Sequence, residues 1–143
     1  MPNATMKVFG FPETLIRQFD HWAVLVRPAQ VTLGSLVLVS TSEHTSFGAL
    51  PADAFAELGE IVPRLEAALK TVVDYEKINY LMLMMVDPHV HFHIFPRYSG
   101  GREAKGISIT DHGWPGPPDL KSAVRLDERD MEALRDVLIT RIS

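Results

Sequence analysis

The sequence predicts an α+β fold: one domain with a main antiparallel sheet, a long helix and a C-terminal helix. The first observation is length, because 143 residues are the size of one domain and no linker divides the chain into two apolar halves. The second is a set of short Val-rich segments bounded by Gly and Pro, which is typical of strands. The third is two longer segments whose apolar residues recur every three or four positions, as in amphipathic helices. We therefore expect residues 1–143 to form one α+β domain.

Four short apolar segments are predicted to be strands. They are residues 23–26, 35–40, 78–86 and 90–95. Pro28 and Gly34 separate the first two segments, which we expect to be antiparallel neighbours joined by a loop. Asp87 and Pro88 separate the last two, and this pair favours a turn or a bulge.

Two segments are predicted to be helices. Residues 51–73 carry apolar side chains at three- and four-residue steps, with Pro63 as a possible kink. The last helix is expected to start near Asp127, whose carboxylate can accept hydrogen bonds from the free N–H groups of the first turn. Leu126 and Met131 occupy the positions of a hydrophobic staple around this start.

The segment between the last predicted strand and the last predicted helix is rich in Gly and Pro. Residues 99–118 contain five glycines and three prolines, several of them close to Trp114, with only isolated apolar residues. This composition predicts a long loop or lid. A large aromatic side chain in such a loop would be exposed unless the loop folds back over the sheet or a partner.

Composition narrows the classes of function. With 14 Lys and Arg against 18 Asp and Glu, the formal net charge is -4, which disfavours bulk nucleic-acid binding. The absence of cysteine excludes disulfides, a thiol nucleophile and Cys-ligated zinc, and it suits a reducing cytoplasm. No segment resembles a membrane span or a signal peptide. We expect a cytoplasmic protein that binds neither nucleic acid nor membranes.

Three of the six histidines, His89, His91 and His93, alternate with bulky apolar residues. On a strand, alternate side chains share one face, so this pattern predicts three imidazoles in a row about 6.6 Å apart, with the apolar residues facing the core. Neighbouring positive charges repel, so the pKa values are expected to fall below the ordinary value of about 6.5. Histidine is an uncommon residue, and an ordinary solvent-exposed strand face would rarely carry it at three alternate positions. We therefore infer a functional site.

Two chemistries fit such a row. Histidines two positions apart on a strand can chelate zinc, iron or copper, and a neutral imidazole can attack a phosphorus centre. A metal site would need a further ligand, for which the loop offers Glu103, Asp111 or His112 without a diagnostic spacing.

The chain resembles the histidine triad (HIT) family of nucleotide hydrolases and transferases. The signature of that family is His-φ-His-φ-His-φ-φ, where φ is apolar, and residues 89–95 fit every position. Residues 34–39 are similar to a strand of the family that begins with Gly-His, and His44 resembles a histidine often found just after it. The helix from Pro51 and the Pro-Arg pair at 96–97 also lie where the family has them.

This resemblance implies an antiparallel sheet with a long helix, usually in a homodimer that binds purine nucleotides. It also implies that His91 attacks the α-phosphorus of a nucleoside phosphate ester, anhydride or phosphoramidate and forms a nucleotidyl-histidine that water cleaves. His89 and His93 would orient that ring and donate hydrogen bonds to phosphate oxygens. This chemistry requires no metal and no cofactor.

The sequence departs from the family pattern at three places. Ser35 replaces the histidine of the Gly-His strand, and only Asp87 and Pro88 remain of a Gly-rich loop that holds the α-phosphate in relatives. Arg27 stands where relatives have a carboxylate or amide for the ribose, so it is expected either to grip a second phosphate or to be a solvated cation.

The candidate substrate-binding residues are therefore Leu25, Arg27, Ser35 and Asp87, of which Asp87 could accept a proton from an imidazole. Leu25 also resembles part of an apolar wall for the base, together with Phe9, Phe11 and Pro28.

The function expected is hydrolysis or transfer at the α-phosphate of a dinucleoside polyphosphate or a phosphoramidate, with His91, His89 and His93 as catalytic residues. One alternative is a nucleotide-binding or regulatory protein with little turnover, because the phosphate-binding elements are incomplete. The other is a metal-dependent enzyme that uses the same histidines.

Overall fold

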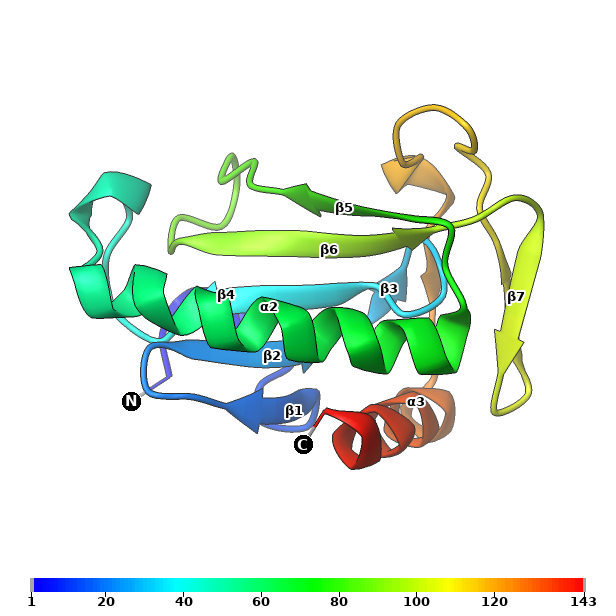
Figure 1. The fold of residues 1–143 in the computed structure, drawn as a ribbon, viewed down its shortest axis with the longest axis horizontal. Helices are drawn as coiled ribbons and strands as arrows, with labels where there is room; N and C mark the ends of the chain where they lie inside the picture. The colour runs from blue at the N-terminus through cyan, green and yellow to red at the C-terminus, as the bar shows by residue number, and fades with distance from the viewer. Residues whose placement is uncertain (1, 143) are drawn as a thin grey trace.

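A computed structural model describes residues 2–142, and Figure 1 shows it as a sheet covered on one face by two helices. The main sheet has five strands in the order β1-β2-β4-β6-β5, and two further pairs, β3-β9 and β7-β8, lie outside it. The strands are β1 (Leu15–Gln18), β2 (Trp22–Val26), β3 (Ala29–Gln30), β4 (Leu36–Ser40), β5 (Lys77–Leu81), β6 (His91–Arg97), β7 (Gly101–Ala104), β8 (Ile107–Thr110) and β9 (Val124–Arg125). The helices are α1 (Ala4–Val8), α2 (Ala52–Val73) and α3 (Glu128–Arg141), with 3-10 turns η1 (Phe47–Ala49) and η2 (Leu120–Ser122).

All pairings within the main sheet are antiparallel, which confirms the predicted α+β class and the pairing of β2 with β4. The register places Leu25 of β2 opposite Val37 of β4, and Val37 opposite His93 of β6. Leu81 of β5 lies on the other side of His93. Because side chains opposite one another share a face, these residues all belong to one face of the sheet.

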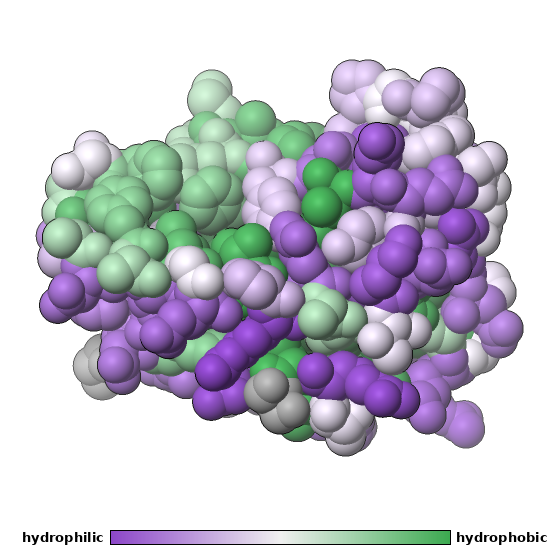
Figure 2. All heavy atoms as spheres, in the orientation of Figure 1, coloured by the Kyte–Doolittle hydropathy of each residue, from purple (hydrophilic) through white to green (hydrophobic). Residues whose placement is uncertain are grey.

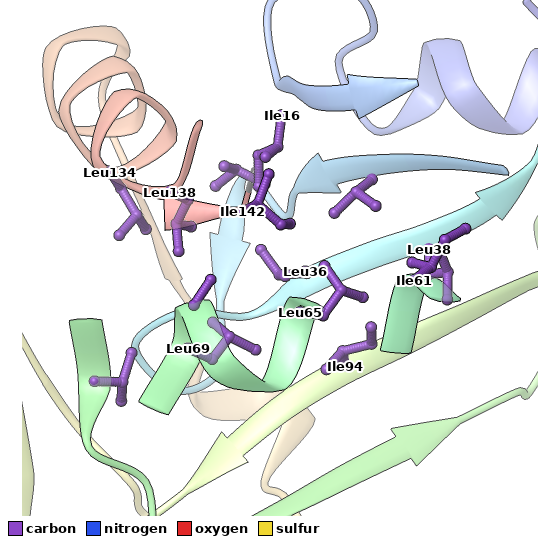
Figure 3. Packing of buried hydrophobic residues seen from close by; sticks show 14 of the residues in the cluster. Ile16, Leu36, Leu38, Ile61, Leu65, Leu69, Ile94, Leu134, Leu138 and Ile142 are labelled. Atoms are coloured by element: carbon purple, nitrogen blue, oxygen red, sulfur yellow. The ribbon is translucent and has the colours of Figure 1, made fainter. Parts of the chain in front are cut away.

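The other face packs against α2 and α3. In Figure 3, Leu65 and Leu69 of α2 lie beside Leu36 of β4, while Leu134 and Leu138 of α3 approach the sheet from the side. The long helix begins and ends within one residue of the prediction, and Pro63 lies inside it. Asp127 is the N-cap of α3, and its carboxylate accepts a hydrogen bond of 2.8 Å from the backbone N–H of Asp130, as predicted.

The histidine-bearing face is covered by the N-terminal segment. Met6, Phe9 and Phe11 pack there against apolar side chains of β2 and β4. Asn3 fixes this segment, because its side chain caps α1 and its amide nitrogen donates to the carbonyls of Ser40 and Ser42 at 2.7 and 2.8 Å. Nothing in the sequence pattern predicted α1, which has only five residues.

Two predicted segments differ from the structure. The third strand ends at Leu81 rather than at residue 86, and residues 82–90 form an irregular connection. Residues 99–118 are not loop throughout, because β7 and β8 form a hairpin there. Its turn uses Lys105 and Gly106, both with positive φ (53° and 78°), as a type I′ hairpin turn requires. Within residues 2–142, no helix is both long enough and apolar enough to cross a bilayer.

Candidate active site

His91 and His93 lie on β6 with their rings in contact, whereas His89 precedes the strand. The ring centroids of His91 and His93 are 5.0 Å apart in an edge-to-face arrangement. Phe9 of the N-terminal segment contacts both rings, at 5.8 and 5.5 Å, and Phe95 stacks on His93 at 6.0 Å. The two imidazoles therefore have partly apolar surroundings, where electrostatic interactions are stronger than in water.

The tautomer of His91 is set by its own strand. Its Nδ1 lies 2.6 Å from the backbone carbonyl oxygen of His89. A carbonyl can only accept, so Nδ1 of His91 carries the proton, and in the neutral ring Nε2 keeps its lone pair. The side chain is only 2% exposed, so this orientation is fixed by packing as well as by the hydrogen bond.

His93 has the opposite tautomer because of Arg27. Nε of Arg27 donates to Nδ1 of His93 at 3.3 Å, so a neutral His93 carries its proton on Nε2. Burial lowers the pKa of His93 to about 4, and the positive charges of Arg27 and of a protonated His91 act in the same direction. When both rings are neutral, the pair thus consists of one ring with a free Nε2 lone pair and one with an Nε2–H donor.

Arg27 is itself held in place. Its Nη1 donates to the backbone carbonyl of Ala29, and its guanidinium lies 5.7 Å from the centre of the Phe95 ring. Burial lowers the pKa of Arg27, but a guanidinium stays cationic at neutral pH. The structure therefore places a fixed positive charge beside the two rings.

The side chain of His89 forms hydrogen bonds with two residues that the sequence analysis did not identify, Thr5 and Glu43. Its Nδ1 lies 2.9 Å from Oγ1 of Thr5, and its Nε2 lies 3.2 Å from a carboxylate oxygen of Glu43. Since the carboxylate accepts, Nε2 carries a proton, and in the neutral ring Nδ1 accepts from the Thr5 hydroxyl. The same hydroxyl accepts the backbone N–H of His89 at 3.3 Å. His89 thus faces its own protein partners, and its backbone carbonyl orients His91.

The predicted substrate-binding residues are not all brought together. Arg27 lies in the site. Leu25 is fully buried in the apolar cluster under the N-terminal segment. Ser35 is also fully buried, and its hydroxyl both donates to the carbonyl and accepts from the N–H of Thr32, so it closes a turn. The carboxylate of Asp87 has no hydrogen bond or ion pair with the rest of residues 2–142, and Glu43 is the carboxylate that meets a histidine.

A pocket of about 230 Å³ opens beside Arg27. It is lined by Val8, Phe9, Arg27, Pro28, Ala29 and Arg125. Phe9 links this pocket to the histidine pair, because its ring touches both imidazoles. Phe9 and Pro28 belong to the apolar wall expected for the base, whereas Arg125 comes from the β3-β9 pair and has no local signal in the sequence.

The possible metal ligands in the loop lie elsewhere. Asp111 is buried in an ion pair with Arg97, with an N–O distance of 2.8 Å, and Glu103 and His112 are exposed and form no hydrogen bond with a histidine of the row. In the part of the chain that the structure describes, no three His, Asp or Glu side chains are grouped so that they could hold a metal ion.

Comparison with known proteins identifies the fold. No protein-family model and no curated protein sequence matches the chain. Among solved structures, a histidine triad protein from Bradyrhizobium japonicum is 21% identical, with a TM-score of 0.76 over 100% of this chain and 98% of its own. One from Sinorhizobium meliloti is 19% identical, with a TM-score of 0.77 over 99% and 96%. One from Marinobacter aquaeolei is 19% identical, with a TM-score of 0.71 over 90% of each chain. The chain therefore has the fold of the histidine triad proteins.

Proposed function

We propose that this protein is a histidine triad nucleotide hydrolase or transferase in which His91 is the nucleophile. The observation that carries the proposal is the hydrogen bond from Nδ1 of His91 to the carbonyl of His89, at 2.6 Å. It leaves Nε2 of a neutral imidazole free to attack, without prior loss of a proton. The substrate class proposed is a purine nucleoside joined through its α-phosphate to a leaving group, as in dinucleoside polyphosphates and phosphoramidates.

In the first step, the lone pair on Nε2 of His91 forms a bond to the α-phosphorus. The bond from phosphorus to the leaving oxygen or nitrogen breaks, and the leaving group takes that electron pair and a proton from solvent. In the second step, the oxygen of water bonds to the phosphorus, the phosphorus–nitrogen bond breaks, and Nε2 recovers its lone pair. Water gives up a proton to solvent, and the nucleoside monophosphate is released.

The Nε2–H of His93 and the guanidinium of Arg27 are proposed to stabilise the negative charge that builds up on the phosphate oxygens. Both groups are fixed before substrate arrives, by the hydrogen bond that joins them. The pocket of about 230 Å³ beside Phe9 and Pro28 is proposed to take the nucleoside, since it offers an aromatic face and two arginines at its edge.

The direct test is to trap the covalent intermediate. Wild-type protein is mixed with a dinucleoside polyphosphate or an adenosine phosphoramidate labelled at the α-phosphate, and is quenched under conditions that avoid acid. Label is expected on wild type and absent from His91→Ala, whose turnover falls roughly 10³-fold or more while nucleotide affinity changes less than about tenfold. His44→Ala is the matched control, because His44 is exposed and, among the described residues, its ring forms a hydrogen bond only with Ser42.

Two results would change the proposal. Label on a residue other than His91 would overturn the mechanism. Nucleotide binding without label or turnover would favour a nucleotide-binding protein instead. That alternative has its own support, since Ser35 faces a turn and contributes nothing to the phosphate site.

We also propose that the protein is a homodimer and that it is cytoplasmic, the latter because a chain without cysteine suits a reducing compartment. Within residues 2–142, β5 is an edge strand that pairs only with β6. The segment after it exposes Leu83, Met85 and Val86 by 49, 86 and 88%, and Phe47 on the 3-10 turn η1 is 39% exposed. Figure 2 shows apolar residues gathered at this end of the molecule. Such a surface is typical of a protein interface.

Light scattering after gel filtration tests the dimer. The expected mass is twice 16.0 kDa for wild type, and it should fall towards 16.0 kDa in Met85→Lys. Ile139→Lys, on the exposed side of α3, is the control that should leave the mass unchanged. A monomeric wild type at micromolar concentration would contradict the proposal.

A further inference from the structure

A second and larger pocket, of about 490 Å³, lies on the histidine-bearing face where β5 begins and β6 ends. Its lining consists of Lys77 and Asn79 of β5, Arg97 of β6, Trp114 and residues 115–117. In the sheet register Asn79 lies opposite Phe95 and Lys77 lies opposite Arg97. Phe95 therefore stands on the same strand between this pocket and His93, so the two sites are separate.

A buried ion pair makes one wall of the pocket rigid. Arg97 is 3% exposed and donates from Nε and Nη2 to the two carboxylate oxygens of Asp111, at 2.8 and 3.1 Å. Burial would raise the pKa of Asp111, but hydrogen bonds from Arg97 and two backbone N–H groups lower it overall. The charges of the pair cancel locally.

Arg97 also joins the two sides of the pocket. Its Nη1 donates to the side-chain oxygen of Asn79 at 2.7 Å, and its Nη2 donates to the carbonyl of Gly116 at 2.8 Å. Gly113 admits no side chain, because a Cβ there would lie 2.2 Å from the carbonyl oxygen of Pro117. The segment that carries Trp114 is thus fixed against β5 and β6.

The side-chain groups left free around this pocket are all donors. Within residues 2–142, the ammonium of Lys77, the amide nitrogen of Asn79 and the indole N–H of Trp114 have no hydrogen-bond partner, and Lys77 has no ion pair. Since Arg97 is neutralised by Asp111, Lys77 supplies the net charge. An anion would satisfy these donors, and the flat surfaces of Trp114 and the prolines beside it would pack against a ring.

We propose that this pocket is a binding site for a small aromatic anion. The anionic group lies at Lys77 and Asn79, and the ring lies against Trp114. The site does not depend on the nucleotide chemistry proposed for His91, because it shares none of the residues that orient the histidine pair.

The intrinsic fluorescence of the protein tests this directly. The chain has two tryptophans, and Trp22 is fully buried with its indole N–H bonded to the carbonyl of Ala54 at 2.8 Å, so Trp114 is the one that can report a ligand. Benzoate and phenyl phosphate are titrated as probes, with neutral benzamide as the matched control. Saturable changes are expected for both anions, with benzamide binding at least tenfold more weakly.

Variants show whether the charge of Lys77 binds the anion. Lys77→Met should weaken benzoate binding roughly tenfold, while Lys70→Met, which removes an exposed lysine from α2, should leave it unchanged. His91→Ala should bind benzoate as wild type does, even if the nucleotide proposal is wrong. Equal binding of benzoate and benzamide, no effect of Lys77→Met, or no change in either the fluorescence or the NMR signal of the Trp114 indole N–H would overturn the proposal.

Discussion

Nε of Arg27 donates a hydrogen bond to Nδ1 of His93 across the sheet, at 3.3 Å, between residues 66 positions apart in the chain. The contact decides the chemistry of the histidine pair, because a cation at Nδ1 both opposes protonation of the ring and fixes its proton on Nε2. The sequence left two roles open for Arg27, a second-phosphate contact and a solvated cation. In the structure, Arg27 forms a hydrogen bond with His93, which neither of these two roles included.

Replacing Arg27 with Met is expected to raise the pKa of His93. The wild-type value of about 4 has burial as its largest cause and the Arg27 charge as the next. The variant value should therefore rise but stay below the ordinary value of about 6.5. NMR titration of the imidazole signals measures it, and Arg17→Met, at an exposed arginine that stacks on Phe19, is the control. An unchanged pKa of His93 in Arg27→Met would show that the guanidinium does not act on the ring.

The lowered pKa of His93 also predicts how stability depends on pH. Between about pH 6.5 and pH 4 the unfolded chain binds a proton at this ring and the folded chain does not, so the free energy of unfolding falls as the pH falls through this window. Below pH 4 both states are protonated and the loss is complete. His93→Gln removes this contribution.

Urea unfolding of wild type and His93→Gln at pH 7.5 and pH 4.5 measures the difference. Wild type is expected to lose more stability over this interval than the variant does, because other acid-sensitive groups, including Asp111, are common to both proteins. An equal loss in the two proteins would mean that His93 titrates alike in the folded and unfolded chains.

Local sequence patterns correctly predicted the strands and the helix whose own apolar residues are enough to explain their burial. β2, β4 and α2 lie where the apolar pattern placed them, because a short continuous apolar segment or a helix with one apolar face must be buried against other elements. Residues 82–86 are as apolar as a strand, yet the pairing of β5 ends where Leu81 meets His93. Whether an apolar segment finds a partner strand depends on the rest of the sheet, which the segment does not encode.

The candidate site, like the fold, was predicted only where a local sequence pattern marks the residues. The alternation of histidines is a local signal, and it located His91 and His93 on one strand. Their partners are distant: Thr5 is 84 positions from His89, and Glu43 is 46 positions from it. A threonine in a five-residue helix and a glutamate after a strand have no pattern that marks them, so only the tertiary structure brings them to the row.

Thr5→Val is expected to destabilise the protein because the Thr5 hydroxyl, 1% exposed as a residue, contacts both the ring and the backbone N–H of His89. Valine has nearly the same shape but leaves two buried polar groups without a partner, which costs about 1–3 kcal/mol of unfolding free energy. Thr71→Val is the matched control, since Thr71 is exposed on α2 and should change stability by less than about 0.5 kcal/mol. Similar effects in both variants, measured by urea unfolding, would show that the Thr5 contacts contribute little.

Gly34→Ala is expected to destabilise the protein, for two reasons that act together. Gly34 has a φ of +87°, in the left-handed region that costs an L-residue about 1–2 kcal/mol. A Cβ at this position would also lie 2.9 Å from Val73 and 3.0 Å from Leu69 at the end of α2, and overpacking of this kind costs about 1–3 kcal/mol. A loss of roughly 2–4 kcal/mol in unfolding free energy should therefore appear in urea unfolding. Gly59→Ala tests whether this is specific: Gly59 lies inside α2 with nothing within 4 Å of its Cβ position, so the same substitution should stabilise by about 0.5–1 kcal/mol. If Gly34→Ala were as stable as wild type, the turn before β4 would not pack closely against Val73 and Leu69 of α2. The packing of the sheet on that helix would then have to be revised.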